Sequence, residues 1–332
     1  MKIVYNIIAV ICINSVQGIL SPIFHRNWDL VNPGDCGIQH NKKTSHNTTF
    51  GTPVRNGEYP WVVHITVQVN ETELKTTRDC YKCREPRKIT NCMGTIITKR
   101  YVLTASSCFE IFGNTSVDPK SVRVRAGLVG MNILCGIYSK CYSDNDYLAQ
   151  SVFFYDHNAP AEEGRNIALI EVSRDFYFHE YVAPICLEHN YLLNKDYGAE
   201  KGIRVSGWNH ETVRVKINEG EYSNLFYSEA TIFTEEENDK IYKFLPAKFT
   251  GVENYLSFFC VEGLPHQTQL TTDVGGPFVV KKLVKDDEER RFYLYGILSF
   301  KISVHYPPHQ GTVDVYTKVR NYFEWILDTI DG

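Results

Sequence analysis

Residues 93–105 read MGTIITKRYVLTA, and this stretch shows the pattern from which the fold can be predicted. It is rich in the β-branched and aromatic residues that favour strands. Eight further short runs of the same kind occur along the chain, separated by Gly, Asn, Asp and Pro. They lie at 61–69, 121–130, 166–172, 202–208, 229–233, 277–284, 292–300 and 313–319. Many short strands with turn residues between them are typical of an all-β sandwich or barrel.

The length of this β-rich region favours two barrels. The runs extend from residue 61 to residue 319, which is long for one sandwich. We therefore expect an all-β fold of two packed six-stranded antiparallel β-barrels. The stretch 321–330, NYFEWILDTI, predicts a C-terminal helix with Asn321 as its N-cap. Its apolar residues recur near a helical period at Tyr322, Trp325, Ile326 and Ile330.

Composition and charge narrow the class of protein. Of the 332 residues, 43% are hydrophobic and 22% charged, as in a globular chain. The net charge of -4 and the lack of long basic runs argue against a nucleic-acid partner. The mixed-charge segment 285–291, KDDEERR, is expected to be a solvated hairpin tip between two strands.

The first 18 residues have the features of a signal peptide. Lys2 precedes a mainly apolar run at 3–13, and Val16 and Gly18 are the small residues that a signal peptidase requires. A membrane anchor would need about 20 apolar residues, and this run is shorter. We expect a secreted, extracellular chain that begins near Ile19 and has no membrane anchor.

Secretion makes the cysteines candidates for disulfides. Nine remain after residue 18, so at least one is free or pairs between chains, which would allow a disulfide-linked dimer. Cys80 and Cys83 form a lone CxxC motif. A zinc site would need a second pair of ligands, so we expect no bound metal. The two cysteines would instead form a disulfide with each other, or one of them with Cys260. Three sequons mark candidate glycosylation sites at Asn47, Asn70 and Asn114.

Eight ordered blocks carry a resemblance to a known family. They read PWVVHI, CMGTIITKRYVLTASSC, NIALIEV, APICL, VSGW, DVGGPF, GILSF and VYTKVRNYFEWI. In this order they resemble trypsin- and chymotrypsin-like serine proteases over about residues 50–330. Residues 48–332 would then be the protease domain and 19–47 an extended N-terminal arm. The arm is similar to the linker of arthropod clip-domain proteases and their inactive homologues, but it has one cysteine where a clip domain needs six.

The resemblance implies a catalytic site without its catalytic groups. The family uses a Ser-His-Asp triad, in which imidazole takes the serine proton and a carboxylate orients the imidazole. Ser107 matches the histidine position, Asn166 the aspartate and Val274 the serine. Losing one member can cost roughly 10⁶-fold in turnover. In the former oxyanion loop, Thr272 precedes Asp273 where the family has glycine.

Activation is expected to fail as well. Family zymogens are cut after a basic residue, and the new N-terminus pairs with the aspartate before the serine. Here Asn47 replaces the basic residue, and TTFG at 48–51 matches the new N-terminus. Asp273, left without that partner, would adopt a rearranged, zymogen-like loop, because an unpaired buried carboxylate is costly.

The same alignment defines a former substrate pocket and the disulfides. Thr268 replaces the aspartate at the pocket floor of trypsin-like enzymes, and Ser299, Lys301 and Asp314 line the walls. Lys301 and Asp314 would project into the pocket and pair across it, unless a one-residue shift in the alignment places one of them outside. The family bridges imply the pairs Cys92–Cys108 and Cys36–Cys186. The spacing of Cys135 and Cys141 allows a small closed loop.

These observations lead to a hypothesis for function. We expect a secreted serine protease homologue that uses no cofactor, performs no catalysis and binds a protease or its substrate as a cofactor, adaptor or decoy. The loop 70–91 would be an interaction surface, since loops commonly carry recognition. By resemblance, the setting would be an extracellular protease cascade, including those of innate immunity. Two alternatives are a serine-type endopeptidase with residual or rearranged activity, with Cys260 or Ser107 as nucleophile, and a purely structural glycoprotein.

Overall fold

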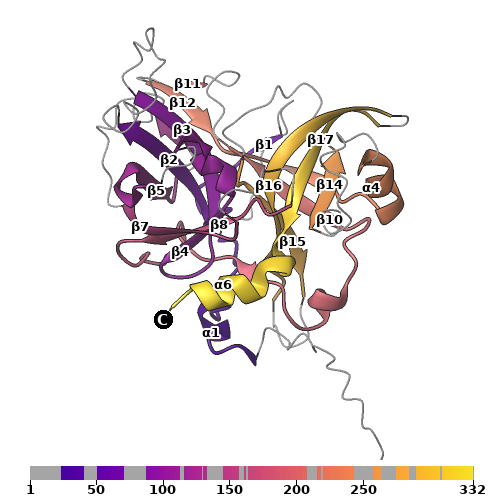
Figure 1. The fold of residues 1–332 in the computed structure, drawn as a ribbon, viewed down its shortest axis with the longest axis horizontal. Helices are drawn as coiled ribbons and strands as arrows, with labels where there is room; N and C mark the ends of the chain where they lie inside the picture. Colours follow the sequence, from indigo (N-terminus) through magenta and orange to yellow (C-terminus); the bar gives the residue numbers. More distant parts are fainter. Residues whose placement is uncertain are drawn as a thin grey trace, which may run out of the picture.

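Six strands close into a barrel in the N-terminal half of the chain (Figure 1). The computed structural model describes residues 24–40, 51–70, 87–112, 116–128, 130–132, 145–156, 161, 164–207, 215–217, 220–242, 257–262, 274–283, 289–306 and 309–331. The barrel strands are β2 Val62–Asn70, β3 Arg87–Ile96, β4 Tyr101–Thr104, β5 Val122–Ala126, β7 Asp146–Phe154 and β8 Ala168–Val172. They pair in the order β2-β3-β4-β8-β7-β5, and each pair is antiparallel.

A second, eight-stranded sheet forms most of the C-terminal half. Its strands are β1 Thr52–Pro53, β9 Cys186–Leu187, β10 Lys201–Ser206, β13 Phe226–Thr231, β14 Phe258–Glu262, β15 Pro277–Lys282, β16 Arg291–Tyr306 and β17 His309–Lys318. The order is β1-β13-β10-β15-β16-β17-β14, with β9 parallel to β16. A bridge between Ile232 and Val261 joins the end of β13 to β14, so six of the strands curl round toward a second barrel. The expected all-β fold is confirmed.

Two of the sequence runs contain more than one strand. The run 93–105 turns between β3 and β4, and the run 121–130 ends its barrel strand at Ala126. Gly127, with φ +69°, follows that strand. The chain then enters a separate three-stranded sheet, made of β6 Gly130–Asn132, β11 Val215–Ile217 and β12 Gly220–Asn224. Glycine tolerates this left-handed backbone, which explains the break after β5.

The helices differ from the sequence expectation in two ways. The C-terminal helix α6, Phe323–Thr329, is present, but its N-cap is Tyr322. Asn321, the expected N-cap, lies in a 3₁₀ turn at Val319–Tyr322 that runs directly into the helix. The other helical segments are α1 Trp28–Val31, α4 Glu235–Tyr242 and the 3₁₀ turns η2 Ser106–Phe112, η3 Pro119–Ser121 and η5 Asn190–Asn194. Within the described residues, no helix has the length and apolar character needed to cross a membrane.

Helix α4 was not expected, although its first turn has a recognisable signal. The backbone N–H and hydroxyl of Thr234 donate to the Glu237 carboxylate at 2.8 and 3.0 Å, and the Glu237 N–H donates back to the Thr234 hydroxyl at 3.3 Å. This is the capping box encoded by a threonine followed three residues later by glutamate.

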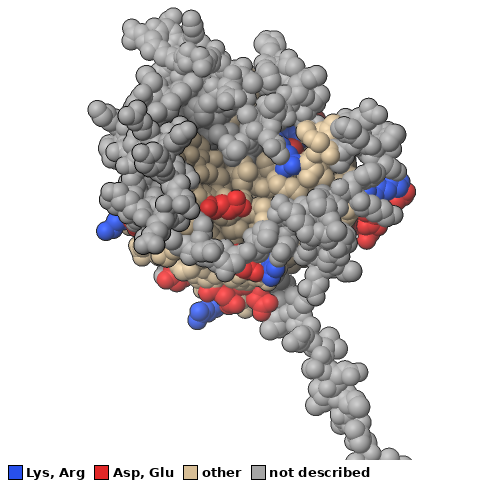
Figure 2. Space-filling model, turned by 45° about the horizontal axis from the view of Figure 1, so that its top comes forward, with Lys and Arg blue, Asp and Glu red and all other residues tan. Residues whose placement is uncertain are grey.

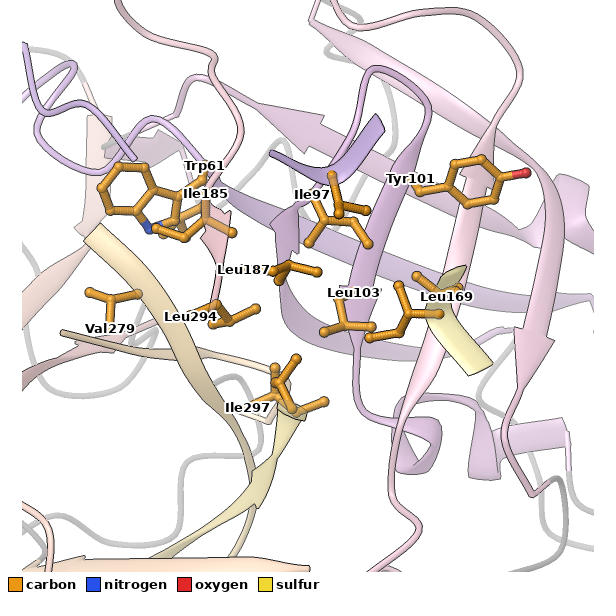
Figure 3. Close-up of a cluster of buried hydrophobic side chains, with 14 of the residues drawn as sticks. Trp61, Ile97, Tyr101, Leu103, Leu169, Ile185, Leu187, Val279, Leu294 and Ile297 are labelled. Atoms are coloured by element: carbon orange, nitrogen blue, oxygen red, sulfur yellow. The ribbon is translucent and has the colours of Figure 1, made fainter. Parts of the chain in front are cut away.

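The main hydrophobic core lies between the two β-structures (Figure 3). Leu103 on β4 and Leu169 on β8 reach it from the closed barrel. Val279 on β15 and Leu294 on β16 reach it from the second sheet, and all four side chains have no exposed surface. Burial of apolar surface on this scale is the main force that stabilises a fold. This shared core fixes the two β-structures relative to one another and therefore positions the residues between them.

The sequence suggested an extended N-terminal arm. The structure shows instead that the described part of the arm is docked against the domain and contains a helix. Its described part, 24–40, contains α1 and is joined to the domain by the Cys36–Cys186 disulfide. Beside that bridge the Gly37 N–H donates to the Pro184 carbonyl at 2.8 Å. The Asn27 side chain donates to the carbonyls of Leu327 and Ile330 at 2.9 and 2.6 Å. The arm therefore satisfies carbonyls at the end of α6, beside which α1 lies in Figure 1.

A buried carboxylate beside β9 makes stability dependent on pH. Glu188 has no exposed surface; it accepts hydrogen bonds from the Tyr197 hydroxyl and from Arg320 Nη2, the latter at 2.7 Å. Loss of hydration on burial raises the pKa of Glu188 to about 7 from its usual 4.5, and Arg320 offsets part of that rise. The folded protein therefore keeps a proton at Glu188 between pH 4.5 and 7 that the unfolded chain releases.

We accordingly expect the contribution of Glu188 to the stability of the fold to decrease as the pH rises. Between pH 5 and pH 8, this one group should lower the free energy of unfolding by on the order of 2–3 kcal/mol. Glu188→Gln should remove that part of the pH dependence, whereas the exposed control Glu236→Gln should retain it. Urea unfolding of the three proteins at both pH values measures this. Equal pH dependence in wild type and Glu188→Gln would contradict the assignment.

Candidate functional site

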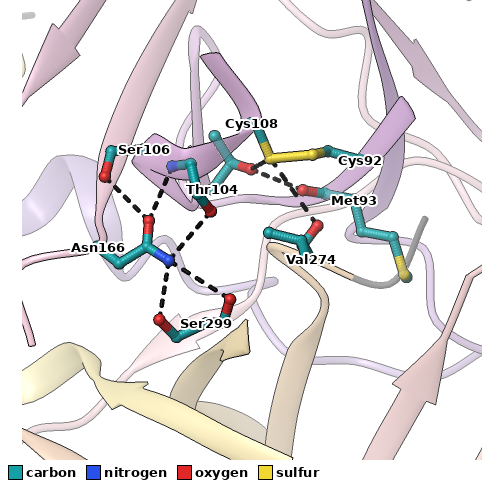
Figure 4. The surroundings of a disulfide bond; sticks show 9 residues. Cys92, Met93, Thr104, Ser106, Cys108, Asn166, Val274 and Ser299 are labelled. Carbon is teal, nitrogen blue, oxygen red and sulfur yellow. Dashed lines mark hydrogen bonds between the residues drawn. A yellow bond between two sulfur atoms is a disulfide. The ribbon is translucent and has the colours of Figure 1, made fainter. Parts of the chain in front are cut away.

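Asn166 lies at the centre of a buried hydrogen-bond network between the two β-structures. Its side chain has no exposed surface. Its carbonyl oxygen accepts from the Ser106 hydroxyl at 2.9 Å and from the Ser107 backbone N–H at 2.8 Å. Its amide nitrogen donates to the hydroxyl of Ser107 at 3.1 Å and to that of Ser299 at 2.8 Å. Figure 4 shows Asn166 between Ser106 and Ser299. A primary amide can serve these partners because it both donates and accepts.

The elements that carry this network come from both halves of the fold. Ser106 and Ser107 begin the 3₁₀ turn η2, directly after β4. Asn166 lies two residues before β8, the strand that pairs with β4. Ser299 lies in β16 at a register shift opposite β17, and its hydroxyl donates to the Ala161 carbonyl at 3.2 Å. Of the residues that the resemblance assigns to the triad, the structure thus brings Ser107 and Asn166 into direct contact.

Val274 lies beside the Cys92–Cys108 disulfide, near Met93 (Figure 4). Its side chain is half-buried and packs against the core of the closed barrel. Its carbonyl accepts from the Met93 N–H at 2.9 Å. Cys108, next to Ser107 in sequence, places its Sγ 4.0 Å from the same carbonyl oxygen. The three positions are therefore neighbours around one disulfide, with Val274 contributing packing and a backbone acceptor.

The turn after Val274 depends on glycine. Gly275 has φ +82°, and a Cβ there would overlap the Met93 carbonyl and the Thr104 hydroxyl. Its N–H donates to the Leu298 carbonyl at 2.8 Å, which ties the turn to β16. Glycine at position 275 is thus explained by a tight approach of this backbone to the closed barrel.

A substitution tests how strictly the turn requires glycine. Gly275→Ala should lower the free energy of unfolding by about 1–3 kcal/mol, since it combines left-handed strain with overlap against a backbone carbonyl. Gly34→Ala is the matched control, because a Cβ at Gly34 meets nothing within 4 Å. Denaturant unfolding of both variants gives the comparison. A loss at Gly275 no larger than that at Gly34 would show that the turn adapts.

The chemistry available to this network is limited. A hydroxyl and an amide do not take a proton from serine near neutral pH, and a hydrocarbon side chain cannot attack a carbonyl. Ser106, Ser107, Asn166 and Ser299 satisfy one another within the fold. Their geometry is that of a structural polar cluster, in which each hydrogen bond stabilises the packing of the two β-structures.

Two of the expected pocket residues, Lys301 and Asp314, form an ion pair. Lys301 and Asp314 are register partners on the adjacent strands β16 and β17, with Lys301 Nζ 3.7 Å from Asp314 Oδ1. They therefore pair with one another, as expected, and do so as cross-strand neighbours. The closer partner of Asp314 is Arg204, whose Nη1 donates to Oδ2 at 2.6 Å. Both the Arg204 and Asp314 side chains are almost fully buried, at 4% and 0% exposure.

Sequence reasoning missed Arg204 although a signal was present. The residue stands inside the apolar strand β10, in the run GIRVSGW, where a charge requires a buried partner. Its guanidinium also donates to the Ser228 hydroxyl at 3.1 Å and to the Glu262 carbonyl at 2.8 Å. The partner itself could not be identified, because Asp314 is 110 residues away in sequence.

Several expected site residues lie outside the described residues. They are Thr268, Thr272, Asp273, Cys80, Cys83, Cys135, Cys141, Asn47 and Asn114. Asn70 is described only through its backbone, as the last residue of β2. The loop expected at 70–91 is shorter than the sequence suggested, because β3 already begins at Arg87 and pairs with Asn70. The loop itself, 71–86, is also outside the described residues.

The described cysteines are accounted for. Both disulfides that the resemblance implies are present, Cys92–Cys108 and Cys36–Cys186. Cys260 is a free thiol with no exposed surface, and burial raises its pKa to about 12. A thiol in this state is neither a nucleophile near neutral pH nor accessible to a second chain. Of the cysteines that the structure describes, none is therefore available for a disulfide-linked dimer.

Two other kinds of site, a metal site and a basic surface, can be compared with the described part of the chain. No three His, Cys, Asp or Glu side chains there are grouped so that they could hold a metal ion. On the face shown in Figure 2, the Lys and Arg side chains of the described residues lie apart from one another. A nucleic-acid surface would instead need a continuous basic patch.

Comparison with known proteins agrees with this architecture. The chain is 27% identical to the proclotting enzyme of Tachypleus tridentatus over 300 residues, which is 89% of this chain and 69% of the relative. It is 25% identical to phenoloxidase-activating factor 1 of Holotrichia diomphalia over 314 residues, covering 90% and 73% of the two chains. It is 24% identical to a CLIP domain-containing serine protease of Bombyx mori over 246 residues, covering 72% and 62%. The trypsin family model matches residues 48–326, and the chain therefore belongs to the trypsin family.

Proposed function

We propose that this protein is a non-catalytic member of the trypsin family that acts by binding other proteins. One observation carries the proposal: Asn166 bonds to Ser106, Ser107 and Ser299 at the place where the family alignment expects a carboxylate and an imidazole. The half-buried valine at position 274 supplies no nucleophile. A protein that keeps the protease fold without the catalytic groups can still use the surface of that fold to bind other proteins.

The proposed setting is an extracellular protease cascade, including those of innate immunity. This step rests on the names of the relatives, which include a proclotting enzyme and a phenoloxidase-activating factor. In such a cascade, a protein with the shape of a protease occupies the place of a protease on its substrate or activator. It would act there as a cofactor, adaptor or decoy.

Stoichiometry separates this role from that of an enzyme. Purified protein would be titrated into a reaction in which an active clip-domain protease cleaves its protein substrate, and the cleavage rate would be followed. A binding protein changes the rate in proportion to its amount and saturates near one molecule per partner. A protease converts many substrate molecules at substoichiometric amounts. Rate changes that saturate near equimolar addition support the proposal, whereas substoichiometric conversion or no effect at any ratio contradicts it.

The endopeptidase alternative would need a displaced nucleophile. Cys260 is fully buried with a raised thiol pKa, and the Ser107 hydroxyl accepts from an amide, which cannot take its proton. No described feature favours this alternative over the binding role.

A further inference from the structure

Two tyrosines and a histidine form an exposed aromatic row on the turn at 177–181. Tyr177 is 79% exposed and Tyr181 is 40% exposed, which is unusual for side chains of this size. The ring of His179 lies between them, with centroid distances of 5.9 Å to Tyr177 and 5.7 Å to Tyr181. Clustered exposed aromatic side chains commonly mark interaction sites on soluble proteins.

The backbone beneath this row is firmly held. The side chains of Phe176 and Phe178 pack into the core of the closed barrel, so Tyr177 between them faces outward. The backbone groups of His179 and Val182 bond to each other twice, at 2.9 and 3.0 Å. The Tyr181 N–H donates to His179 Nδ1 at 3.2 Å, which fixes the imidazole between the two phenol rings. Rings presented in this way lose little conformational entropy when a partner binds.

A carboxylate lies within the row, at Glu180. Glu180 is exposed and accepts a hydrogen bond from the Tyr181 hydroxyl, an interaction that raises the pKa of Tyr181. Asp175, two residues before Tyr177, already has the Arg100 guanidinium 4.0 Å from its carboxylate, so Glu180 is the carboxylate that can receive a ligand. Arg174 is engaged elsewhere, because its guanidinium stacks over Tyr147 at 4.3 Å. The faces of aromatic rings carry the negative part of the ring quadrupole. The tyrosine rings and the Glu180 carboxylate therefore both favour a cation.

We propose that Tyr177, His179, Tyr181 and Glu180, the aromatic row with its carboxylate, form a docking surface for an arginine or lysine side chain on a partner protein. The cation stacks on the tyrosine faces and forms an ion pair with Glu180. The Glu180 carboxylate and the ring faces favour this partner over an acidic or purely apolar one. The inference rests on the proposed binding role and specifies the chemistry of the partner.

The probe is a pair of synthetic peptides that differ in charge alone. One is acetyl-Gly-Arg-Gly-Arg-Gly with a C-terminal biotin tag, and the other carries citrulline, a neutral isostere, at both arginine positions. The full chain is passed over surfaces coated with each peptide at low ionic strength. The arginine surface should bind the protein and the citrulline surface should not. Equal binding to both surfaces, or no binding to the arginine surface, would overturn the proposal.

Variants identify the surface responsible. Tyr177→Ala with Tyr181→Ala should weaken binding about 5- to 30-fold, as expected for the loss of two exposed cation–π contacts. Glu180→Gln should weaken it about two- to fivefold and reduce its dependence on salt. Tyr191→Ala is the matched aromatic control, since Tyr191 is also 42% exposed but already has Lys195 over its ring. Glu235→Gln, in the first turn of α4, is the matched exposed carboxylate.

The outcomes test the docking surface separately from the proposed non-catalytic role of the protein. All five substitutions, in four variants, are at exposed side chains, so thermal unfolding should show unchanged folding in each variant. Binding that is equally strong in the double tyrosine variant would overturn the docking surface and leave the non-catalytic role intact. Hydrolysis of peptide esters by the wild-type protein would instead contradict the non-catalytic role, whatever the peptide surfaces show.

Discussion

Replacing Asp314 with alanine is expected to lower the free energy of unfolding by about 3–5 kcal/mol. The carboxylate is fully buried between Arg204 at 2.6 Å and Lys301 at 3.7 Å. Those two cationic side chains are themselves only 4% and 6% exposed. Without Asp314, the Arg204 guanidinium keeps its positive charge in a poorly hydrated interior but loses its carboxylate partner, and that loss is the source of the cost. Urea unfolding with the disulfides intact measures the loss.

Two further variants give this prediction its controls. Asp328→Ala removes an acidic partner from the ion pair with His25, but the Asp328 side chain is 66% exposed. Its cost should be below about 1 kcal/mol. Asp314→Asn keeps an acceptor for Arg204 while removing the charge, so its cost should lie between the two alanine variants. If Asp314→Ala costs no more than Asp328→Ala, the cluster does not stabilise the fold.

Asn166→Leu is expected to have an effect of similar size, about 3–5 kcal/mol. Leucine has nearly the same shape but leaves the Ser107 N–H and the Ser106 hydroxyl without their acceptor, and it removes the donor to the Ser299 hydroxyl. Each buried polar group left unsatisfied costs about 1–3 kcal/mol. The measurement is again urea unfolding, with circular dichroism to confirm that the variant folds.

Asn166→Asp is the informative comparison at that position. A carboxylate still accepts from the Ser107 N–H and the Ser106 hydroxyl, and the hydroxyls of Ser107 and Ser299 can rotate to donate to it. We therefore expect Asn166→Asp to cost less than Asn166→Leu. The reverse order would mean that the amide donor is essential and that the network differs from the one described.

The overall architecture could be predicted from local sequence because it depends on short-range patterns. Runs such as 93–105 and the terminal stretch 321–330 carry their own strand and helix propensity, and these elements are present. The residues at which these strands and this helix begin and end could be predicted less accurately. The break between β3 and β4 and the start of α6 at Phe323 depend on turns whose geometry is set by packing.

The contents of the site could be predicted only in part. The resemblance assigned Ser107 and Asn166 to neighbouring positions, and the structure places them in contact. The Arg204–Asp314 pair and the Glu188–Arg320 pair join residues 110 and 132 positions apart. No local pattern encodes such pairings, because they are selected by burial and charge once the strands have assembled. Helix α4 is different, since its capping box at Thr234 and Glu237 was visible in the sequence.

The non-catalytic role is tested most directly by covalent labelling with a fluorophosphonate, which reacts with activated serine hydroxyls. Purified protein would be exposed to the reagent before and after treatment with trypsin, beside active trypsin as a positive control, and intact mass would be measured. A panel of peptide esters would be assayed in parallel. We predict that the reagent leaves the mass of the protein unchanged, both before and after trypsin treatment, and that no peptide ester is hydrolysed. A stoichiometric adduct, or turnover abolished by Ser107→Ala or Cys260→Ala, would contradict the account.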